Sequence, residues 1–386
     1  MEPENQTALN APPATNDDQT TPVIAPGEPI PAAKSERGLR WIFIGSQGLR
    51  AGWSVLITTF LFVLFDWVLG EMLIHTHLVR KGAQFLLRSM FLAELAAVLS
   101  LLGAVFVVGL IERRRVLDYN LAGPRRAQHF LSGLLGGFLA LSALVGALAA
   151  GGWLHFGPMA LSGTGILRYG AYWGGFFLLV GCFEEGSSRC YLLYTLTRGI
   201  NFWWALFLVA VMCTDLVISI RGNGAWGVYV IAILGLLPCL VLHLRAAPHS
   251  GFWQAAWVTS TFFGFVHTAN NGENWVGIFQ AAAIGFIFCV SVRVTGSAWW
   301  AIGCHAAWDW AETFFYGAAD SGLQAQGHFL TVSPAGNKLW SGGLDGPEGS
   351  ILGIPVLLLL VLALLLIYGR KKPAAPAALP AAPSVV

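Results

Sequence analysis

Long apolar segments dominate this sequence and constrain its fold more than any other feature. A helix needs about 20 predominantly apolar residues to cross a bilayer. Ten segments of about this length are candidate transmembrane helices: residues 51–74, 91–111, 129–153, 171–195, 203–220, 227–243, 253–269, 275–292, 297–316 and 350–368. Only 11% of the residues are charged, against about 25% in a soluble domain. The sequence therefore predicts an all-α, polytopic membrane helix bundle of about eight to ten transmembrane helices.

Low-complexity sequence flanks the apolar region at both ends. Residues 1–40 are rich in Pro, Ala, Thr and acidic side chains, and residues 369–386 are rich in Pro and Ala. Such compositions cannot bury a core. We therefore predict a disordered N-terminal tail over 1–40, a helix bundle over 41–368 and a disordered C-terminal tail over 369–386. The N-terminal segment has no basic region followed by an apolar core, so it does not resemble a cleavable signal peptide.

The distribution of basic residues predicts the orientation of the bundle. With the N-terminus in the cytoplasm, 15 of the 22 Lys and Arg residues face inward, and the segment ERRRVLDYNLAGPRR (residues 112–126) holds five of these. The positive-inside rule then favours two cytoplasmic termini. We expect an integral, multi-pass protein of a bacterial-type cell membrane, with the lipid bilayer as its first partner. The formal net charge of +2 indicates no nucleic-acid partner.

The fourth predicted span carries three ionisable side chains in the stretch EEGSSR. Glu185 and Arg189 lie four residues apart, so they share one face of a helix and can pair. Glu184 is rotated by about 100° from Glu185 and points elsewhere. This geometry predicts a division of labour, in which arginine neutralises one carboxylate and the other is free for chemistry.

Two later spans contribute histidines. The stretch FFGFVHTANN places Phe263 and His267 four residues apart, and WWAIGCHAAWDW does the same for His305 and Asp309. Asp309 can therefore orient His305. A helix bundle can bring such groups together around one interior cavity. A structural ion pair or an interfacial histidine would explain each feature singly, but their joint occurrence favours a functional site.

Taken in order, EEGSSR, FGFVH and HAAWD resemble the three motifs of the CPBP family, the CAAX protease and bacteriocin-processing (Abi) family of intramembrane proteases. The resemblance spans roughly residues 90–316 and implies a type II CAAX-protease-like core. By position, Glu184 matches the glutamate that activates water, and His267 matches the histidine that works with it. His305 and Asp309 match the pair assigned to metal binding or to stabilising the oxyanion.

The resemblance also implies roles for neighbouring residues. Glu185, Arg189 and Phe263 match family positions that shape the site. Ser188 and Cys190 depart from the family, which commonly has an aromatic residue and a glycine at these two places. This departure puts the local packing around the first motif in question, but not the set of ionisable groups.

The spacing of the motifs is a second departure. Glu184 and His267 are 83 residues apart, which is farther than is usual in the family. All three motifs lie within residues 171–316, and an inserted hairpin over 203–243 accounts for the excess. Removing this hairpin leaves eight spans, the usual family core, and keeps the orientation of everything that follows it.

The resemblance implies hydrolysis of a peptide bond, for which two mechanisms stay open. In the first, Zn²⁺ is held by Glu184, His267 and His305 and lowers the pKa of its bound water to about 7. In the second, no metal takes part: Glu184 and His267 activate water, and His305 with Asp309 stabilises the oxyanion. The chain has no HExxH zinc motif. The expected partner is a peptide or protein substrate, which is prenylated for some relatives.

A non-enzymatic membrane protein is the alternative function, either a proton-coupled transporter or a catalytically silent scaffold. Intramembrane Glu, Asp and His also form proton relays, but the chain shows no inverted internal repeat. Convergence of Glu184, His267 and His305 in one cavity would favour the enzyme. We interpret the loop over residues 317–349 as a connector, with gating of the site or partner binding as the alternative.

Overall fold

The computed structural model describes residues 40–45, 47–79, 87–219, 225–270, 272–320 and 322–369. The chain divides into two units, Met1–Trp41 and Ile42–Val386, and the helix bundle belongs to the second. The two predicted tails, residues 1–40 and 369–386, lie almost entirely outside the described residues.

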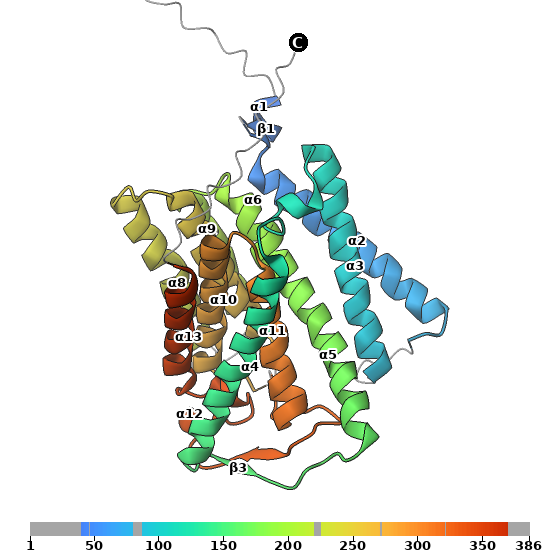
Figure 1. Ribbon diagram of the computed structural model, residues 1–386. Helices are drawn as coiled ribbons and strands as arrows, with labels where there is room; N and C mark the ends of the chain where they lie inside the picture. The colour runs from blue at the N-terminus through green and yellow to red at the C-terminus, as the bar shows by residue number, and fades with distance from the viewer. Residues whose placement is uncertain are drawn as a thin grey trace, which may run out of the picture. The chain divides into compact units, whose positions relative to one another are not determined.

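All ten predicted spans contain helix (Figure 1). The long helices are α2 (Ala51–His75), α3 (Leu87–Glu112), α4 (Arg126–Ala150), α5 (Thr164–Glu185), α7 (Phe202–Ser219), α8 (Ala225–Leu244), α9 (Ser250–His267), α10 (Trp275–Thr295), α11 (Trp299–Trp310) and α13 (Gly353–Tyr368). A π-helix, η2 (Gly186–Leu192), and the short α6 (Leu193–Thr197) continue α5, and a second π-helix, η3 (Ala311–Tyr316), continues α11.

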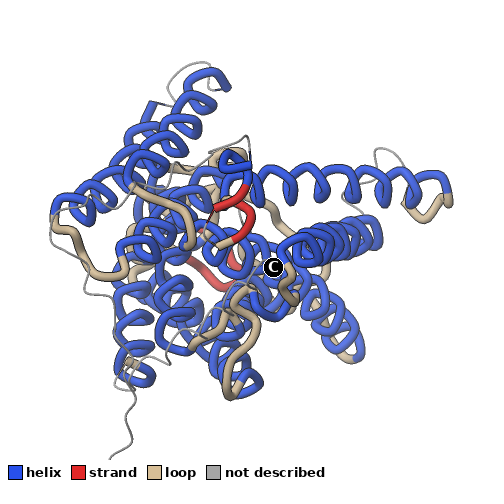
Figure 2. Tube along the Cα trace, turned by 90° about the horizontal axis from the view of Figure 1, so that it is seen from above, coloured by secondary structure: helices blue, strands red, loops and turns tan. Residues whose placement is uncertain are grey.

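Short elements make up the rest of the regular structure. They are α1 (Arg40–Phe43), α12 (Lys338–Ser341), the 3₁₀ turns η1 (Val116–Asp118) and η4 (Pro347–Gly349), and the strands β1 (Ile44–Gly45), β2 (Gly48–Leu49), β3 (Leu154–Phe156) and β4 (Val332–Pro334). The strands form two antiparallel pairs, β1 with β2 and β3 with β4. Figure 2 shows how little of the chain these strands occupy beside the helices.

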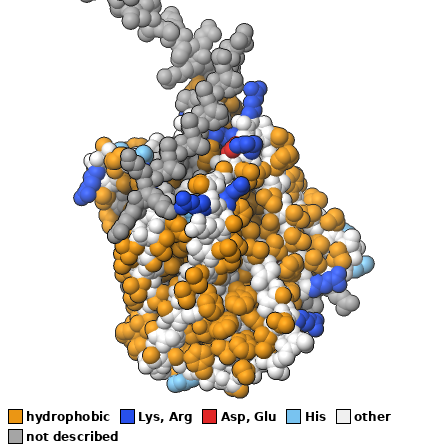
Figure 3. Space-filling model, in the orientation of Figure 1, with side chains coloured by type: hydrophobic (Ala, Val, Ile, Leu, Met, Phe, Trp, Pro, Cys, Tyr) orange, Lys and Arg blue, Asp and Glu red, His pale blue; other side chains and the backbone are white. Residues whose placement is uncertain are grey.

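Within the described residues, seven helices are long and apolar enough to cross a membrane: Ala51–His75, Leu87–Glu112, Arg126–Ala150, Thr164–Thr197, Phe202–Ser219, Gly227–Leu244 and Trp275–Thr295. The other three predicted spans are shorter or more polar. Helix α13 has 16 residues, α11 has 12 before η3, and α9 buries Gln254 and the run Thr259–Thr261. Apolar side chains cover most of the face in Figure 3. These features confirm a polytopic membrane helix bundle.

The start of α2 and the end of α13 lie on the same side of the bundle (Figure 1). At the start of α2, Ser54 donates a hydrogen bond to Glu112, the last residue of α3. Arg198, which follows α6, pairs with the same carboxylate at 2.9 Å. The ring of Tyr368, the last residue of α13, packs 5.3 Å from the ring of His129 at the start of α4.

Glycines let α4 and α11 pack backbone against backbone. A Cβ atom added to Gly133, Gly137 or Gly303 would lie 2.2, 2.1 or 2.3 Å from a backbone carbonyl oxygen of the facing helix. Small residues allow such close approach between membrane helices. The contact fixes the position of α11, and with it His305 and Asp309.

The predicted hairpin over residues 203–243 corresponds to α7 and α8. The two helices pack together and against α9, and Val209, Ile231 and Ala256 from the three helices belong to one buried cluster. A Cβ on Gly235 of α8 would lie 2.5 Å from the side chain of Val209. The hairpin therefore supports the outer face of α9.

The described residues of segment 317–352, which we call the strap, fold back onto the bundle. Strand β4 pairs with β3 in the register Leu154↔Pro334, and Trp340 stacks on Trp153 with ring centroids 4.8 Å apart. Gln280 of α10 donates to the strap carbonyls of Glu348 and Ser350 at 2.5 and 2.8 Å. Main-chain and side-chain contacts hold this segment against α10 and the end of α4, while its role as a connector stays a prediction.

Replacing Gly137 by valine should push α4 and α11 apart. The added side chain would collide with the Cys304 carbonyl, and such overpacking costs about 1–3 kcal/mol or more. We expect a lower thermal unfolding midpoint in detergent for Gly137→Val. Gly146 of the same helix has nothing within 4 Å of its Cβ position, so Gly146→Val is the matched control. Equal midpoints for the two variants would show that the close contact is absent.

Candidate active site

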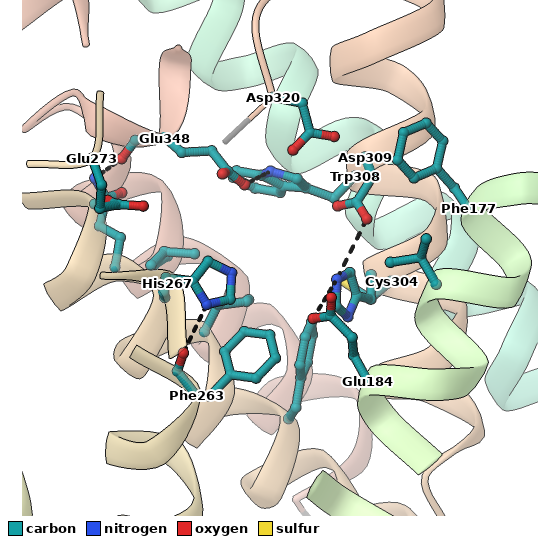
Figure 4. A pocket seen from close by; sticks show the side chains of 18 residues that line it. Phe177, Glu184, Phe263, His267, Glu273, Cys304, Trp308, Asp309, Asp320 and Glu348 are labelled. Carbon is teal, nitrogen blue, oxygen red and sulfur yellow. Dashed lines mark hydrogen bonds and ion pairs between the residues drawn. The ribbon is translucent and has the colours of Figure 1, made fainter. Parts of the chain in front are cut away.

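A cavity of about 130 Å³ lies between α5, α9, α10, α11 and the strap (Figure 4). Glu184 of α5, His267 of α9, and His305 and Asp309 of α11 all line it. The predicted convergence of groups from three helices is therefore present. Among the described residues that line the cavity, none comes from α7 or α8.

The first motif lies where α5 passes into the π-helix η2. The Glu185 carboxylate and the Arg189 guanidinium are 3.2 Å apart, and both side chains are completely buried. Glu184 is 33% exposed and faces the cavity. One carboxylate is thus paired and the other is accessible, as the helical spacing predicts. π-helical turns occur often at functional sites, and neither this one nor η3 after Asp309 was predicted.

Aromatic rings surround the Arg189 guanidinium. Its central carbon lies 4.3 Å from the ring centroid of Phe263 and 5.4 Å from that of Phe288. Its Nε donates to the carbonyl of Gly285 at 3.3 Å. Cation–π contacts of this kind stabilise a buried cation. Phe263, which the family resemblance places among the site-shaping residues, therefore contacts the motif-one arginine directly.

His305 is held by the carboxylate that Arg189 neutralises. Its Nδ1 lies 2.8 Å from Oε1 of Glu185. Because an ionised carboxylate can only accept, this nitrogen carries a proton. The other nitrogen, Nε2, lies 3.4 Å from Asp309 and 3.8 Å from Glu184. The contact between Glu185 and His305 joins residues 120 positions apart, and no sequence pattern indicates it.

His267 is oriented by its own helix. Its Nδ1 lies 2.7 Å from the carbonyl oxygen of Phe263. A carbonyl can only accept, so Nδ1 carries the proton and Nε2 has a free lone pair. His267 and Glu184 lie on different sides of the cavity in Figure 4. His267 is the last residue of α9. The cavity extends beyond this residue, since Glu273 in the loop before α10 also lines it.

The predicted zinc ligands do not form a metal site in this geometry. Over the described ranges of the chain, no group of three or more His, Cys, Asp or Glu side chains is arranged so that it could hold a metal ion. Glu184, His267 and His305 are among these described residues. We therefore derive no step through zinc, and the zinc mechanism stays a prediction.

Three further carboxylates line the cavity that were not predicted as site residues. Glu273 lies between α9 and α10, and Asp320 and Glu348 belong to the strap. The Nε1–H of Trp308 donates to Glu348 at 2.8 Å, and the hydroxyl of Thr313 donates to Asp320 at 2.9 Å. The sequence shows these acids only as isolated charges in connecting segments. The fold-back of the strap brings Asp320 and Glu348 to the site, and the loop between α9 and α10 brings Glu273.

Burial makes these loop carboxyls weak acids. It raises the pKa of Glu348 to about 8, with the charge of Asp320 as a second cause. Burial likewise raises the pKa of Glu273 to about 7, with the charge of Glu348 adding to the effect. Desolvation disfavours the charged form of a carboxyl group, and so does a neighbouring like charge. The docked strap therefore favours protonated carboxyls.

Removing Arg189 should destabilise the protein. Arg189→Ala leaves Glu185 buried and unpaired, which typically costs about 3–5 kcal/mol. We expect a lower unfolding midpoint and a lower yield of folded protein. Arg168, an exposed arginine of α5, is the matched control, and Arg168→Ala should behave like the wild type. A wild-type midpoint for Arg189→Ala would show that the pair contributes nothing to stability.

The docked strap should loosen as the pH rises. Glu348 titrates near 4.5 when undocked and near 8 when docked, so the docked form binds more protons between these values and loses stability as pH increases through that window. Hydrogen–deuterium exchange of residues 338–350, corrected for intrinsic rates, should show falling protection from about pH 5 to pH 8. Glu348→Gln should weaken this dependence, and the remainder comes from Glu273 and Asp345, whose pKa values burial also raises. Protection that is independent of pH in the wild type would contradict it.

Comparison with protein-family models gives one match. Residues 239–311 match the model described as type II CAAX prenyl endopeptidase Rce1-like. The matched segment contains His267, His305 and Asp309, whereas Glu184 lies before it. No curated protein and no solved structure matches the chain. The predicted resemblance is therefore confirmed over this segment: residues 239–311 of this polytopic membrane protein are similar to Rce1-like type II CAAX prenyl endopeptidases.

Proposed function

We propose that this protein is an intramembrane endopeptidase that hydrolyses a peptide bond with a water molecule activated by Glu184. One observation carries the proposal. Glu184, His267 and His305 come from three helices, yet they line one small cavity in a bundle whose exterior is apolar. The Rce1-like match indicates a protease for this region of the chain.

Glu184 and His267 supply two acceptors for the attacking water. The accessible carboxylate of Glu184 is one, and the unprotonated Nε2 of His267 is the other. A water that donates a hydrogen bond to each of them keeps a lone pair for the carbonyl carbon of the substrate. Glu184 then takes a proton from the water as general base and delivers it to the leaving amine.

His305 is the proposed donor to the oxyanion. Glu185 accepts a hydrogen bond from Nδ1–H, and this fixes the ring so that Nε2 is the nitrogen beside Glu184 and Asp309. In its imidazolium form, His305 donates from Nε2 to the negative oxygen of the tetrahedral intermediate. Donors that are held in place before the reaction stabilise such charge effectively. Glu185 and Arg189 act as positioning residues, because they reach the reaction only through His305.

We also propose that the start of α2 and the end of α13 both lie on the cytoplasmic side of a bacterial-type cell membrane, so that both termini are cytoplasmic. Arg113–Arg115, Arg125 and Arg126 adjoin the ends of α3 and α4 that meet there, which agrees with the positive-inside rule. The strap lies on the other side of the bundle, at the C-terminal end of α4 and the N-terminal end of α10. It therefore faces the outer side of the membrane. The substrate is a peptide or protein, and prenylated and unprenylated peptides are separate arms of any test.

Glu184→Gln should abolish proteolysis while the protein remains folded. The amide has nearly the same size but cannot accept the proton of the water. The wild type and the variant would be purified and compared by mass spectrometry for new peptide termini, in pools of prenylated and unprenylated peptides. Asp215→Asn, which alters an exposed carboxylate on α7, is the control and should cleave normally. Retained turnover by Glu184→Gln would remove Glu184 from the mechanism.

A further inference from the structure

The cavity wall has a strong excess of acidic over basic side chains. Five carboxylate side chains line it: Glu184, Glu273, Asp309, Asp320 and Glu348. Among the described lining residues there is no Lys or Arg, and His267 and His305 are the only basic side chains. The volume of about 130 Å³ is close to the ~150 Å³ cavity that accepts one benzene molecule. The cavity thus has room for about one side chain of a ligand.

Hydrogen-bond donors are scarce at the strap end of the cavity. The single Nε1–H of Trp308 is shared, because it lies 2.8 Å from Glu348 and 3.1 Å from Glu312. Glu312 is completely buried, and its Oε1 has no hydrogen-bond partner among the described residues. Its other oxygen accepts from the same Trp308 indole that binds Glu348. An ionised carboxylate accepts about four hydrogen bonds, and the protein supplies far fewer here. These carboxyls therefore stay protonated until a bound cation supplies the missing donors and favours their ionised form.

The main chain holds Glu348 in place before any ligand arrives. Gln280 binds the carbonyl of Glu348 at 2.5 Å and that of Ser350 at 2.8 Å. Asn274 donates to the carbonyl of Gly349 at 3.3 Å. A group that is already ordered loses little conformational entropy when it binds a partner. The position of Glu348 across the cavity from His267 in Figure 4 is therefore a built feature of the strap.

We propose that Glu348 and Asp320 form a subsite for a compact organic cation of the substrate, such as the side chain of lysine or arginine or a free amino terminus. An ammonium group brings three N–H donors and a guanidinium brings five, which supplies the donors that the site lacks. Hydrogen bonds between ionised partners are the strong ones. This inference rests on the proposed function, since it names the class of peptide that the enzyme selects.

The subsite lies beside the reacting groups. Asp309 contacts His305 at 3.4 Å, and Asp309, Asp320 and Glu348 line the same small cavity. A basic residue bound by Glu348 and Asp320 therefore places the neighbouring peptide bond near Glu184 and His305. Glu348 and Asp320 determine specificity, while the chemistry stays with Glu184, His267 and His305.

Peptide pools that differ at one position test the proposal. Two pools of N-acetylated peptides carry either lysine or its uncharged analogue norleucine at a fixed position, with the other positions mixed. A third pool has a free amino terminus and norleucine, which separates a side-chain cation from a terminal one. We expect the wild type to cleave one of the cationic pools with a KM about tenfold lower than that of the acetylated norleucine pool.

Substitutions at the subsite should remove this preference without removing the activity. Glu348→Gln and Asp320→Asn should each raise KM for the preferred cationic pool about tenfold and leave KM for norleucine peptides and kcat nearly unchanged. Glu71→Gln, which changes a half-buried carboxylate of α2 that does not line the cavity, should leave the preference intact. If Glu348 and Asp320 had a purely structural role, the substitutions would change KM for the cationic and norleucine pools alike. If Glu348→Gln fails to fold, Asp320→Asn decides the question.

Binding to the Glu184→Gln protein separates this inference from the proposed function. Tighter binding of a cationic pool, without cleavage of any pool by the wild type, would support the subsite and contradict the protease. Cleavage of all pools with equal KM would overturn the subsite and leave the protease standing. Equal binding of all pools to Glu184→Gln would also overturn the subsite.

Discussion

The buried pair of Glu185 and Arg189 is the interaction on which the rest of the site depends. Both side chains are completely removed from solvent, and charges at such depth are tolerated only when they are paired and hydrogen-bonded. The pair also has a second duty, because Glu185 contacts His305 at 2.8 Å. Arg189 thereby connects the aromatic core around Phe263 to the imidazole that faces the cavity. Stability and the proposed catalytic geometry depend on the same few atoms.

Close helix packing keeps these groups in register. Helix α11 carries both His305 and Asp309 and is pressed against α4 through Gly133, Gly137 and Gly303. Lipid offers no hydrophobic drive for helix association, so small residues and close van der Waals contact hold such helices together. Gly181 of α5 also faces α11, because a Cβ atom there would lie 3.0 Å from the carbonyl oxygen of Ile302. Glycines on α4 and α5 thus help to position the helix that carries His305.

The strap makes the wall of the cavity more acidic. The bundle contributes Glu184, His267 and His305, the proposed reactive groups, and the strap adds Asp320 and Glu348 to the cavity wall. These acids are costly to bury, as the raised pKa of Glu348 shows, and a protein retains such cost most readily where it serves binding or catalysis. The proposed cation subsite explains why these buried acids are retained. It also explains why the strap is clamped to α10 by several hydrogen bonds.

The sequence by itself determined the helices and the local part of the site. Each helix is visible because a bilayer demands about 20 apolar residues, and Glu185 with Arg189, or His305 with Asp309, are neighbours one turn apart. Only the tertiary structure decided that Glu185 binds His305 and that Glu348 reaches the cavity. It also decided that π-helices follow both Glu185 and Asp309, because hydropathy does not distinguish an α-helical from a π-helical turn. Contacts within one turn follow from a fixed period, whereas contacts between distant segments depend on how whole helices and a strap without periodicity pack together.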